Sequence, residues 1–166
     1  MDDGPRMHHR PTLRDRPRMP AAYGIAAEPD GQLEWSDVLN QLTAARNYWV
    51  CTTRPDGRPH AMPVWGLWLA EGVVFSTDPT SRKGRNLAAR PAAVIHLESG
   101  DDVVVLEGEV QSYDGNMTAF AEAYEAKYAF RPEPGPTQGV YALRPRRVLA
   151  WREADFPRSA TRWVLG

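Results

Sequence analysis

Short runs of apolar residues, separated by turn-forming residues, fill the central part of the chain. These runs are rich in β-branched and aromatic side chains, which favour strands. Strands are predicted over residues 48–53, 59–69, 73–77, 92–98, 103–110, 139–143 and 147–151. The clearest turn signal is Arg54-Pro55-Asp56-Gly57, because proline presets φ and glycine adopts positive φ. The pattern therefore predicts a succession of short antiparallel strands.

Three segments have helical rather than strand-like spacing. The first helix is expected over residues 37–46 with Ser36 as its N-cap. The second is expected over residues 81–89, and the third over residues 115–129 with Asp114 as its N-cap. The third helix carries a stripe of large side chains that we interpret as core packing: Met117, Phe120, Ala121, Tyr124 and Tyr128.

Together these elements predict a mainly β fold with flanking helices, built as a six- to seven-stranded antiparallel β-barrel that is closed or nearly closed. No strand is followed by the glycine-rich turn of dinucleotide-binding folds, which excludes a Rossmann fold. The expected organisation is a flexible, basic, proline-rich arm over residues 1–30, a barrel domain over residues 31–153 and a C-terminal tail over residues 154–166. The arm is interpreted either as a disordered terminus or as a segment that docks on a partner subunit.

The composition excludes several classes of function. A formal net charge of −1 gives no field that would attract nucleic acid. The single cysteine, Cys51, excludes an internal disulfide and a cysteine-based zinc site, and we interpret it as a buried small apolar residue. No apolar stretch approaches the ~18–20 residues of a membrane span, and the first residues lack the apolar region of a signal peptide. We therefore expect a cytoplasmic protein without nucleic-acid or membrane partners.

The run from Phe75 to Leu87 carries the most specific chemistry in the chain. An apolar strand ends there in the hydroxyls of Ser76 and Thr77, and Ser81-Arg82-Lys83 opens the following helix. The start of a helix exposes unpaired N–H groups and the positive end of the helix dipole. Hydroxyls and cations added at that point build an anion site of the size of a phosphate group. The alternative interpretation is a solvated basic helix start.

In its context, this run resembles the FMN-phosphate motif of the pyridoxamine 5′-phosphate oxidases. The similar segment runs roughly from Trp35 to Val110, in the order strand, hydroxyls, turn, Ser-Arg-Lys, helix, proline and strand. The larger family is that of the FMN-binding split barrels, or flavin/deazaflavin oxidoreductases, and the tail over residues 155–163 is similar to short actinobacterial members. The resemblance implies a split β-barrel fold.

The resemblance also implies roles for particular residues. Arg82 and Lys83 would hold the cofactor phosphate, and Thr77 would donate its hydroxyl to it. The strand from Ala61 to Trp65 would lie along the flavin ring and offer backbone groups to the edge of the ring. The cofactor-binding residues implied in this way are Met62, Pro63, Val64, Trp65, Ser76, Thr77, Ser81, Arg82 and Lys83.

The same comparison separates this chain from true vitamin B6 oxidases. Those enzymes carry an arginine at the position of Ala61 and a lysine at the position of Gly66. The resemblance therefore implies hydride transfer between a bound FMN and a small conjugated organic acceptor other than pyridoxine. The deazaflavin coenzyme F-420 is the alternative cofactor. A non-enzymatic protein that sequesters a flavin or haem on the same barrel is the alternative function.

A flavin carries its own hydride chemistry, so the chain needs no dedicated catalytic residue. The sequence agrees, because it offers no catalytic triad, no carboxylate pair at a defined spacing and no cluster of metal ligands. The family resemblance implies a homodimer that binds a small-molecule substrate. The aromatic side chains offered as interface elements, with burial in a single chain as the alternative, are Tyr23, Trp151, Phe156 and Trp163.

A few single residues carry further expectations. Trp65 and Trp68 lie three positions apart on one predicted strand, so they should face opposite sides of it. His60 and His96 lie on different strands, where a lone histidine is more often structural than ligand-binding. Asn86 is expected to bond the backbone of the preceding loop.

Overall fold

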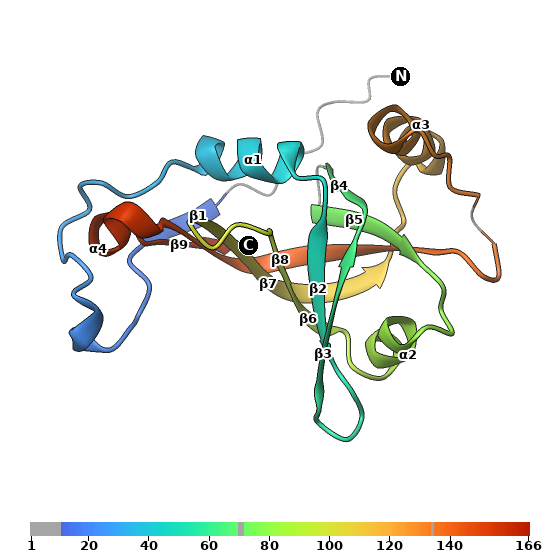
Figure 1. Cartoon of the computed structure of the whole chain (residues 1–166), viewed down its shortest axis with the longest axis horizontal. Coiled ribbons are helices and arrows are strands. Elements are labelled where there is room, and N and C mark those ends of the chain that lie inside the picture. Colours follow the sequence, from blue (N-terminus) through green and yellow to red (C-terminus); the bar gives the residue numbers. More distant parts are fainter. Residues whose placement is uncertain (1–10, 70–71, 134) are drawn as a thin grey trace.

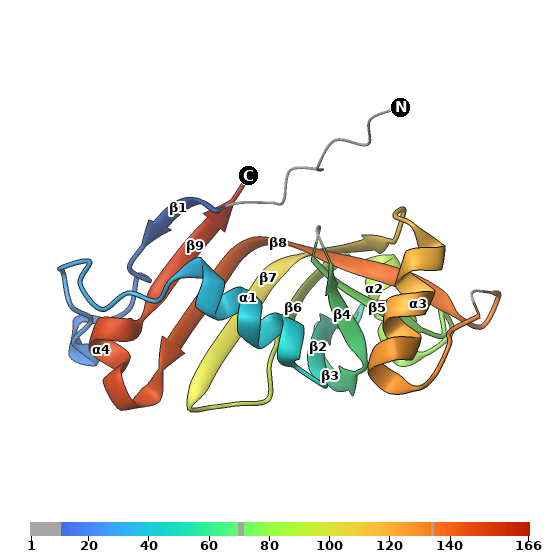
Figure 2. The ribbon, with the colours of Figure 1, turned by 90° about the horizontal axis from the view of Figure 1, so that it is seen from above.

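The computed structural model describes residues 11–69, 72–133 and 135–166 of the chain (Figures 1 and 2). Nine strands occur in these residues: β1 Pro11–Asp15, β2 Tyr48–Thr53, β3 Pro59–Val64, β4 Gly66–Leu69, β5 Gly72–Thr77, β6 Ala92–His96, β7 Asp102–Ser112, β8 Gly139–Arg152 and β9 Thr161–Leu165. The α-helices are α1 Trp35–Ala44, α2 Arg82–Ala89, α3 Met117–Tyr128 and α4 Phe156–Ser159, and short 3-10 turns span Ala21–Tyr23 and Glu153–Asp155. The mainly β class with flanking helices is confirmed, with more strands than the six or seven predicted.

The strands form one antiparallel sheet in the order β1-β9-β8-β7-β6-β2-β3, with β5 joining β8 to β4. The strand predicted over residues 59–69 is two strands, because the chain bends at Trp65. The first, β3, pairs with β2, and the second, β4, pairs with β5. Strands β3 and β4 end the two sides of the sheet, and they are joined by the covalent chain at the bend but not by backbone hydrogen bonds. The barrel is therefore split rather than closed.

Strand β8 ties the two halves of the sheet together. Two separate strands were predicted here, but residues Gly139–Arg152 form one strand that pairs along its length with β7. Its first half also pairs with β5 and its second half with β9. The pairing of β7 with β8 shifts register between Glu107 and Gly108, where a Cβ on Gly108 would lie 2.1 Å from the carbonyl oxygen of Arg144. Only glycine fits this close approach of the two backbones.

The starts of two helices differ from the predicted ones. Helix α1 begins at Trp35 rather than residue 37, because Glu34 and Asp37 form a capping box; Ser36 is not the N-cap. Helix α3 begins at Met117, since Asn116 Oδ1 accepts a hydrogen bond of 3.0 Å from the Ala119 amide. The predicted cap, Asp114, instead forms an ion pair with Arg144.

Two apolar clusters hold the sheet and the helices together. The larger lies between α1 and the sheet, with Val38 and Leu42 packed among buried residues of most strands. The smaller lies beneath α3, where Phe120, Tyr124 and Tyr128 are buried and Met117 packs at the margin. The predicted core role of the α3 stripe is thereby confirmed. Cys51, predicted to be buried, is a half-buried free thiol whose pKa is raised by desolvation.

Both ends of the described chain belong to the sheet. Residues Pro11–Asp15 form β1 on β9, where Arg162 and Asp15 form an ion pair. Arg16 then donates hydrogen bonds to the carbonyl oxygens of Asp30 (2.8 Å) and Ala160 (3.0 Å). Residues 1–10 of the predicted arm lie outside the described residues.

Each of the aromatic residues proposed for an interface contacts another aromatic ring of the same chain. Trp163 on β9 is 1% exposed, and its ring lies 5.5 Å from that of Trp35. Trp151 and Tyr23 both contact the ring of Phe156. None of the helices in the described part of the chain combines the length and apolarity needed to cross a bilayer.

Candidate anion and cofactor site

The start of α2 is organised by hydrogen bonds within its own turn. Ser81 is the N-cap, and its hydroxyl accepts a hydrogen bond of 3.0 Å from the amide of Gly84. Asp78 accepts hydrogen bonds from both the amide (2.7 Å) and the hydroxyl (2.8 Å) of Thr80. The helix therefore begins at Arg82, within a residue of the predicted start.

Gly84 allows the first turn of α2 to pack directly on the preceding turn. A Cβ at this position would lie 2.4 Å from the carbonyl oxygen of Pro79 and 2.7 Å from that of Asp78. Both contacts are with backbone, so the helix start would have to move.

We expect Gly84→Ala to lower the free energy of unfolding by about 1–3 kcal/mol, the typical cost of overpacking. The variant should also weaken anion binding, because it displaces the cations of the first turn. Urea unfolding measures the first effect, and titration with FMN the second. Gly100→Ala is the matched control, since nothing lies within 4 Å of a Cβ at Gly100. A Gly84→Ala protein as stable as the control would contradict this account of the turn.

Lys83 turns back from α2 to the end of β5. Its Nζ donates a hydrogen bond of 2.8 Å to Thr77 Oγ1, which lies 3.4 Å from Ser81 Oγ. Partial burial lowers the pKa of Lys83. Among the described residues no carboxylate forms an ion pair with Lys83 or Arg82. The structure therefore joins the hydroxyls of Thr77 and Ser81 to the ammonium group of Lys83, while Arg82 is exposed in the same first turn of α2.

Ser76 does not join this cluster. Successive side chains of a strand point to opposite faces, so Ser76 and Thr77 diverge at the end of β5. The structure thus separates Ser76 from the other predicted phosphate contacts.

A buried polar layer lies behind the helix start. Asn86 is fully buried, and its Nδ2 donates a hydrogen bond of 2.9 Å to Thr52 Oγ1 on β2. The predicted bond from Asn86 to the loop backbone is therefore wrong. Three buried side-chain atoms in this region have no hydrogen-bond partner: Arg54 Nε, His60 Nδ1 and Asn86 Oδ1.

Unpaired buried polar atoms are costly, so their concentration around one helix start calls for an explanation. Arg54 Nε is a donor, whereas Asn86 Oδ1 is an acceptor. A ligand that carries both acceptor oxygens and hydroxyls could pair with both atoms. A phosphate ester on a hydroxylated chain, such as the ribityl phosphate of FMN, has this combination. The residues present therefore fit the phosphate end of that cofactor.

The sequence did not reveal this layer, because Thr52, His60 and Asn86 belong to three different elements. Thr52 and His60 are opposite each other in the β2–β3 ladder, and Asn86 of α2 bonds to Thr52. No local motif marks such a set. Only the alternation of β2, which turns Thr52 toward the core, is a partial signal.

The predicted ring-binding strand is an exposed sheet edge. Strand β3 pairs with β2 on one side and ends the sheet on the other, which leaves backbone groups free. Met62 is 48% exposed and Trp65 is 38% exposed, although both are large and apolar. Val64 is half-buried and Pro63 is exposed. Met62 and Trp65 therefore offer exposed apolar side chains beside unpaired backbone groups.

Trp65 is held at the bend by helix α3. Its ring stacks on that of Tyr128 at 4.7 Å and 6°, and the Arg46 guanidinium lies 5.4 Å from the Trp65 ring centre. The Tyr128 hydroxyl accepts a hydrogen bond of 3.0 Å from the amide of Gly66. Trp68 packs on the other side, against Trp35 of α1, which confirms that the two tryptophans diverge.

The bend also brings the two ends of the candidate site together. The β4–β5 register pairs Gly66 with Phe75, so Thr77 lies two residues beyond this pair, near the bend. The end of β5 therefore lies near the start of β4, which directly follows the exposed strip of β3.

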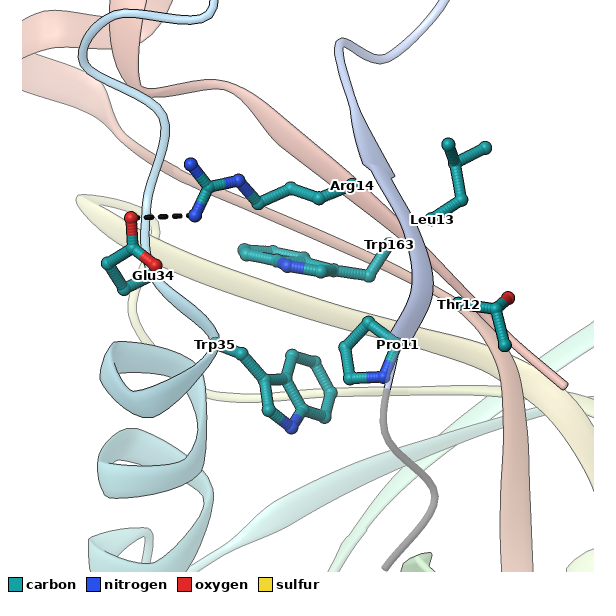
Figure 3. A pocket seen from close by; sticks show the side chains of 7 residues that line it. All are labelled: Pro11, Thr12, Leu13, Arg14, Glu34, Trp35 and Trp163. Atoms are coloured by element: carbon teal, nitrogen blue, oxygen red, sulfur yellow. Dashed lines mark ion pairs between the residues drawn. The ribbon is translucent and has the colours of Figure 1, made fainter.

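Two cavities lined by described residues lie elsewhere. One, of about 330 Å³, lies between β1 and the start of α1, and the ion pair between Arg14 and Glu34 (2.6 Å) spans it (Figure 3). Trp163 and Trp35 form its inner wall. The other, of about 450 Å³, is lined mainly by charged residues of β7, β8 and β9. Neither contains a residue predicted to bind the cofactor.

Sequence comparison relates this chain to a known family. A family model described as pyridoxamine 5′-phosphate oxidase matches residues 36–152. The pyridoxine/pyridoxamine 5′-phosphate oxidase of Methylibium petroleiphilum is 32% identical over 133 residues, which are 76% of this chain. The match spans only 59% of the length of that relative.

Solved structures show the same fold. An F420 reductase aligns with a TM-score of 0.55 and 23% identity, over 66% of this chain and 93% of its own. A haem-binding protein from Mycobacterium smegmatis aligns with a TM-score of 0.53 and 24% identity, over 64% of this chain and 49% of its own. The fold is therefore shared by proteins with different cofactors. The family model and the curated relative establish that this chain belongs to the pyridoxamine 5′-phosphate oxidase family.

Proposed function

We propose that this protein is an oxidoreductase that binds FMN and transfers a hydride between the flavin and a small conjugated organic acceptor. The observation that supports it most directly is the cluster of Thr77, Ser81, Arg82 and Lys83 beside unpaired buried polar atoms and an exposed apolar strand edge. The deazaflavin coenzyme F-420, which also carries a phosphate, is the alternative cofactor.

In this proposal Arg82 and Lys83 hold the phosphate by charge-assisted hydrogen bonds, and Thr77 adds its hydroxyl. Met62, Pro63, Val64 and Trp65 lie along the ring. Bound FMN would supply the hydride chemistry. The free backbone groups of β3 would orient the ring, and the stacked Trp65 and Tyr128 would keep water from one side of the acceptor site.

The acceptor is proposed to differ from that of the B6 oxidases. Ala61 and Gly66 replace the arginine and lysine of those enzymes, and Gly66 is buried with its amide bonded to Tyr128. No cationic side chain can project from either position. A second copy of the chain, covering the exposed edge of β3, is the partner we propose.

Cofactor loading followed by a redox cycle tests the proposal. The full chain is incubated separately with FMN, coenzyme F-420 and haemin, desalted, and examined by absorbance. We expect a retained flavin or deazaflavin spectrum that a reductant bleaches and a quinone or nitroaromatic acceptor restores faster than with the free cofactor. Retained flavin without accelerated reoxidation, or a haem spectrum alone, would reject the oxidoreductase proposal in favour of a sequestering protein.

A further inference from the structure

His60 lies on the face of the sheet that α2 covers. It is directly opposite Thr52 in the β2–β3 ladder, so the two side chains share one face. Thr52 is buried and accepts the hydrogen bond of Asn86 from α2. The imidazole of His60 therefore faces the helix that begins with Arg82 and Lys83.

Two unpartnered buried atoms mark this location independently of the helix start. The Nδ1 atom of His60 is inaccessible to solvent and has no hydrogen-bond partner. Asn86 is fully buried, and its Oδ1 likewise accepts no hydrogen bond. Native proteins rarely leave such atoms unpaired. Their position next to the hydroxyl and cation cluster points to a ligand that completes the set.

Every charged group that acts on His60 is positive. Arg54 faces it from the end of β2, and Lys83 and Arg82 face it from α2. The carboxylate of the nearby turn, Asp56, is bonded to Arg58 and interacts with Arg54 and Arg82 rather than with His60. Burial and these three cations hold the pKa of His60 below its ordinary value of 6.5. The ring is therefore neutral at physiological pH.

A bound phosphate reverses this local balance of charge. A phosphate monoester carries about −1.5 to −2 charges at pH 7 and three acceptor oxygens. A protonated imidazole has an N–H on each ring nitrogen, so it can donate to the anion and to a second acceptor at once. We propose that His60 is a contact residue of the anion site and takes up a proton when a phosphate monoester binds. This inference rests on the proposed function, in which that monoester is FMN.

The sign of the effect follows from linkage between proton and ligand binding. An anion close to His60 raises its pKa, so between the free and bound values the complex holds a proton that the free protein lacks. Affinity must then fall as pH rises through this interval, by up to about tenfold per pH unit for one proton. The second ionisation of the phosphate, near pH 6, acts in the opposite direction, so the effect is measured above pH 7.

Calorimetry measures the proton directly. The full chain is titrated with FMN at pH 7.5 in two buffers of different ionisation enthalpy, and the difference in heat gives the protons taken up. We expect a substantial fraction of one proton for the native protein, and close to none for His60→Gln or for riboflavin, which lacks the phosphate. His96→Gln is the matched control, because His96 stacks on Trp49 on a different strand; its uptake should equal that of the native protein.

The outcomes separate this inference from the proposed function. FMN binding without proton uptake, or with uptake that persists in His60→Gln, overturns the inference and leaves the cofactor proposal intact. If FMN does not bind, the cofactor proposal fails, and inorganic phosphate is titrated while the His60 ring protons are followed by NMR. A rise in the pKa of His60 with phosphate then supports the inference, and an unchanged pKa overturns it. If His60→Gln does not fold, the NMR measurement on the native chain tests the inference in its place.

Discussion

The double variant Arg82→Ala/Lys83→Ala should bind FMN at least about 100-fold more weakly than the native chain, a loss of roughly 2.7 kcal/mol. Hydrogen bonds to charged groups contribute about 1.5–3 kcal/mol each, and the exposed Arg82 is expected at the low end of that range. Lys83 should account for the larger share, because it is partly buried and already oriented by Thr77. Quenching of flavin fluorescence measures the two dissociation constants.

A matched control separates a specific contact from the loss of positive charge. Arg85 and Arg90 are exposed cations of the same helix and its C-cap, bonded to the carbonyl oxygens of Thr80 and Pro55. Arg85→Ala/Arg90→Ala removes the same charge, and we expect its affinity for FMN to change less than about threefold. An equal loss of FMN affinity in the two double variants would mean that Arg82 and Lys83 contribute only positive charge and no specific contact.

The second large effect is on stability. Trp163→Ala should lower the free energy of unfolding by about 3–5 kcal/mol, as is typical for a large aromatic removed from a core. The indole is buried between β1, β9 and the start of α1, so its loss should loosen the contact of the N-terminal strand with the helix. Urea unfolding at two protein concentrations measures the change.

The same variant also tests whether Trp163 packs within one chain or at an interface between two chains. Burial within one chain predicts a destabilisation that does not depend on protein concentration. Tyr23→Ala, which removes an exposed aromatic side chain, is the control and should cost less than about 1 kcal/mol. A loss below that value for Trp163→Ala, together with a shift in oligomeric state, would instead make Trp163 an interface residue.

The parts of the site that could be predicted from the sequence depend on neighbours along the chain. Strand β5, the turn at Asp78, the Ser81 cap and the start of α2 lie within one short run, and each has its own local signal. Hydroxyls at a strand end and cations at a helix start have a direct chemical meaning. The structure accordingly joins Thr77, Ser81 and Lys83 by side-chain contacts, and Arg82 lies in the same turn.

The parts that could not be predicted depend on contacts between distant segments. The bend at Trp65 arises because β3 and β4 pair with different strands, which no pattern within residues 59–69 indicates. Proline-rich composition suggested a flexible arm, yet Pro11–Asp15 gains a partner strand in β9. The pairing of Asn86 with Thr52 joins residues 34 positions apart. Such contacts override local propensity, as tertiary structure commonly does.

The helix start from Ser81 to Lys83 is proposed to bind the phosphate of a flavin. Calorimetric titration of the full chain with FMN and with riboflavin, in a buffer without phosphate, tests it most directly, since the two ligands differ only in the phosphate group. We expect FMN to bind at least about 100-fold more tightly than riboflavin. Equal affinity for the two ligands, or no binding of either, would contradict the claim.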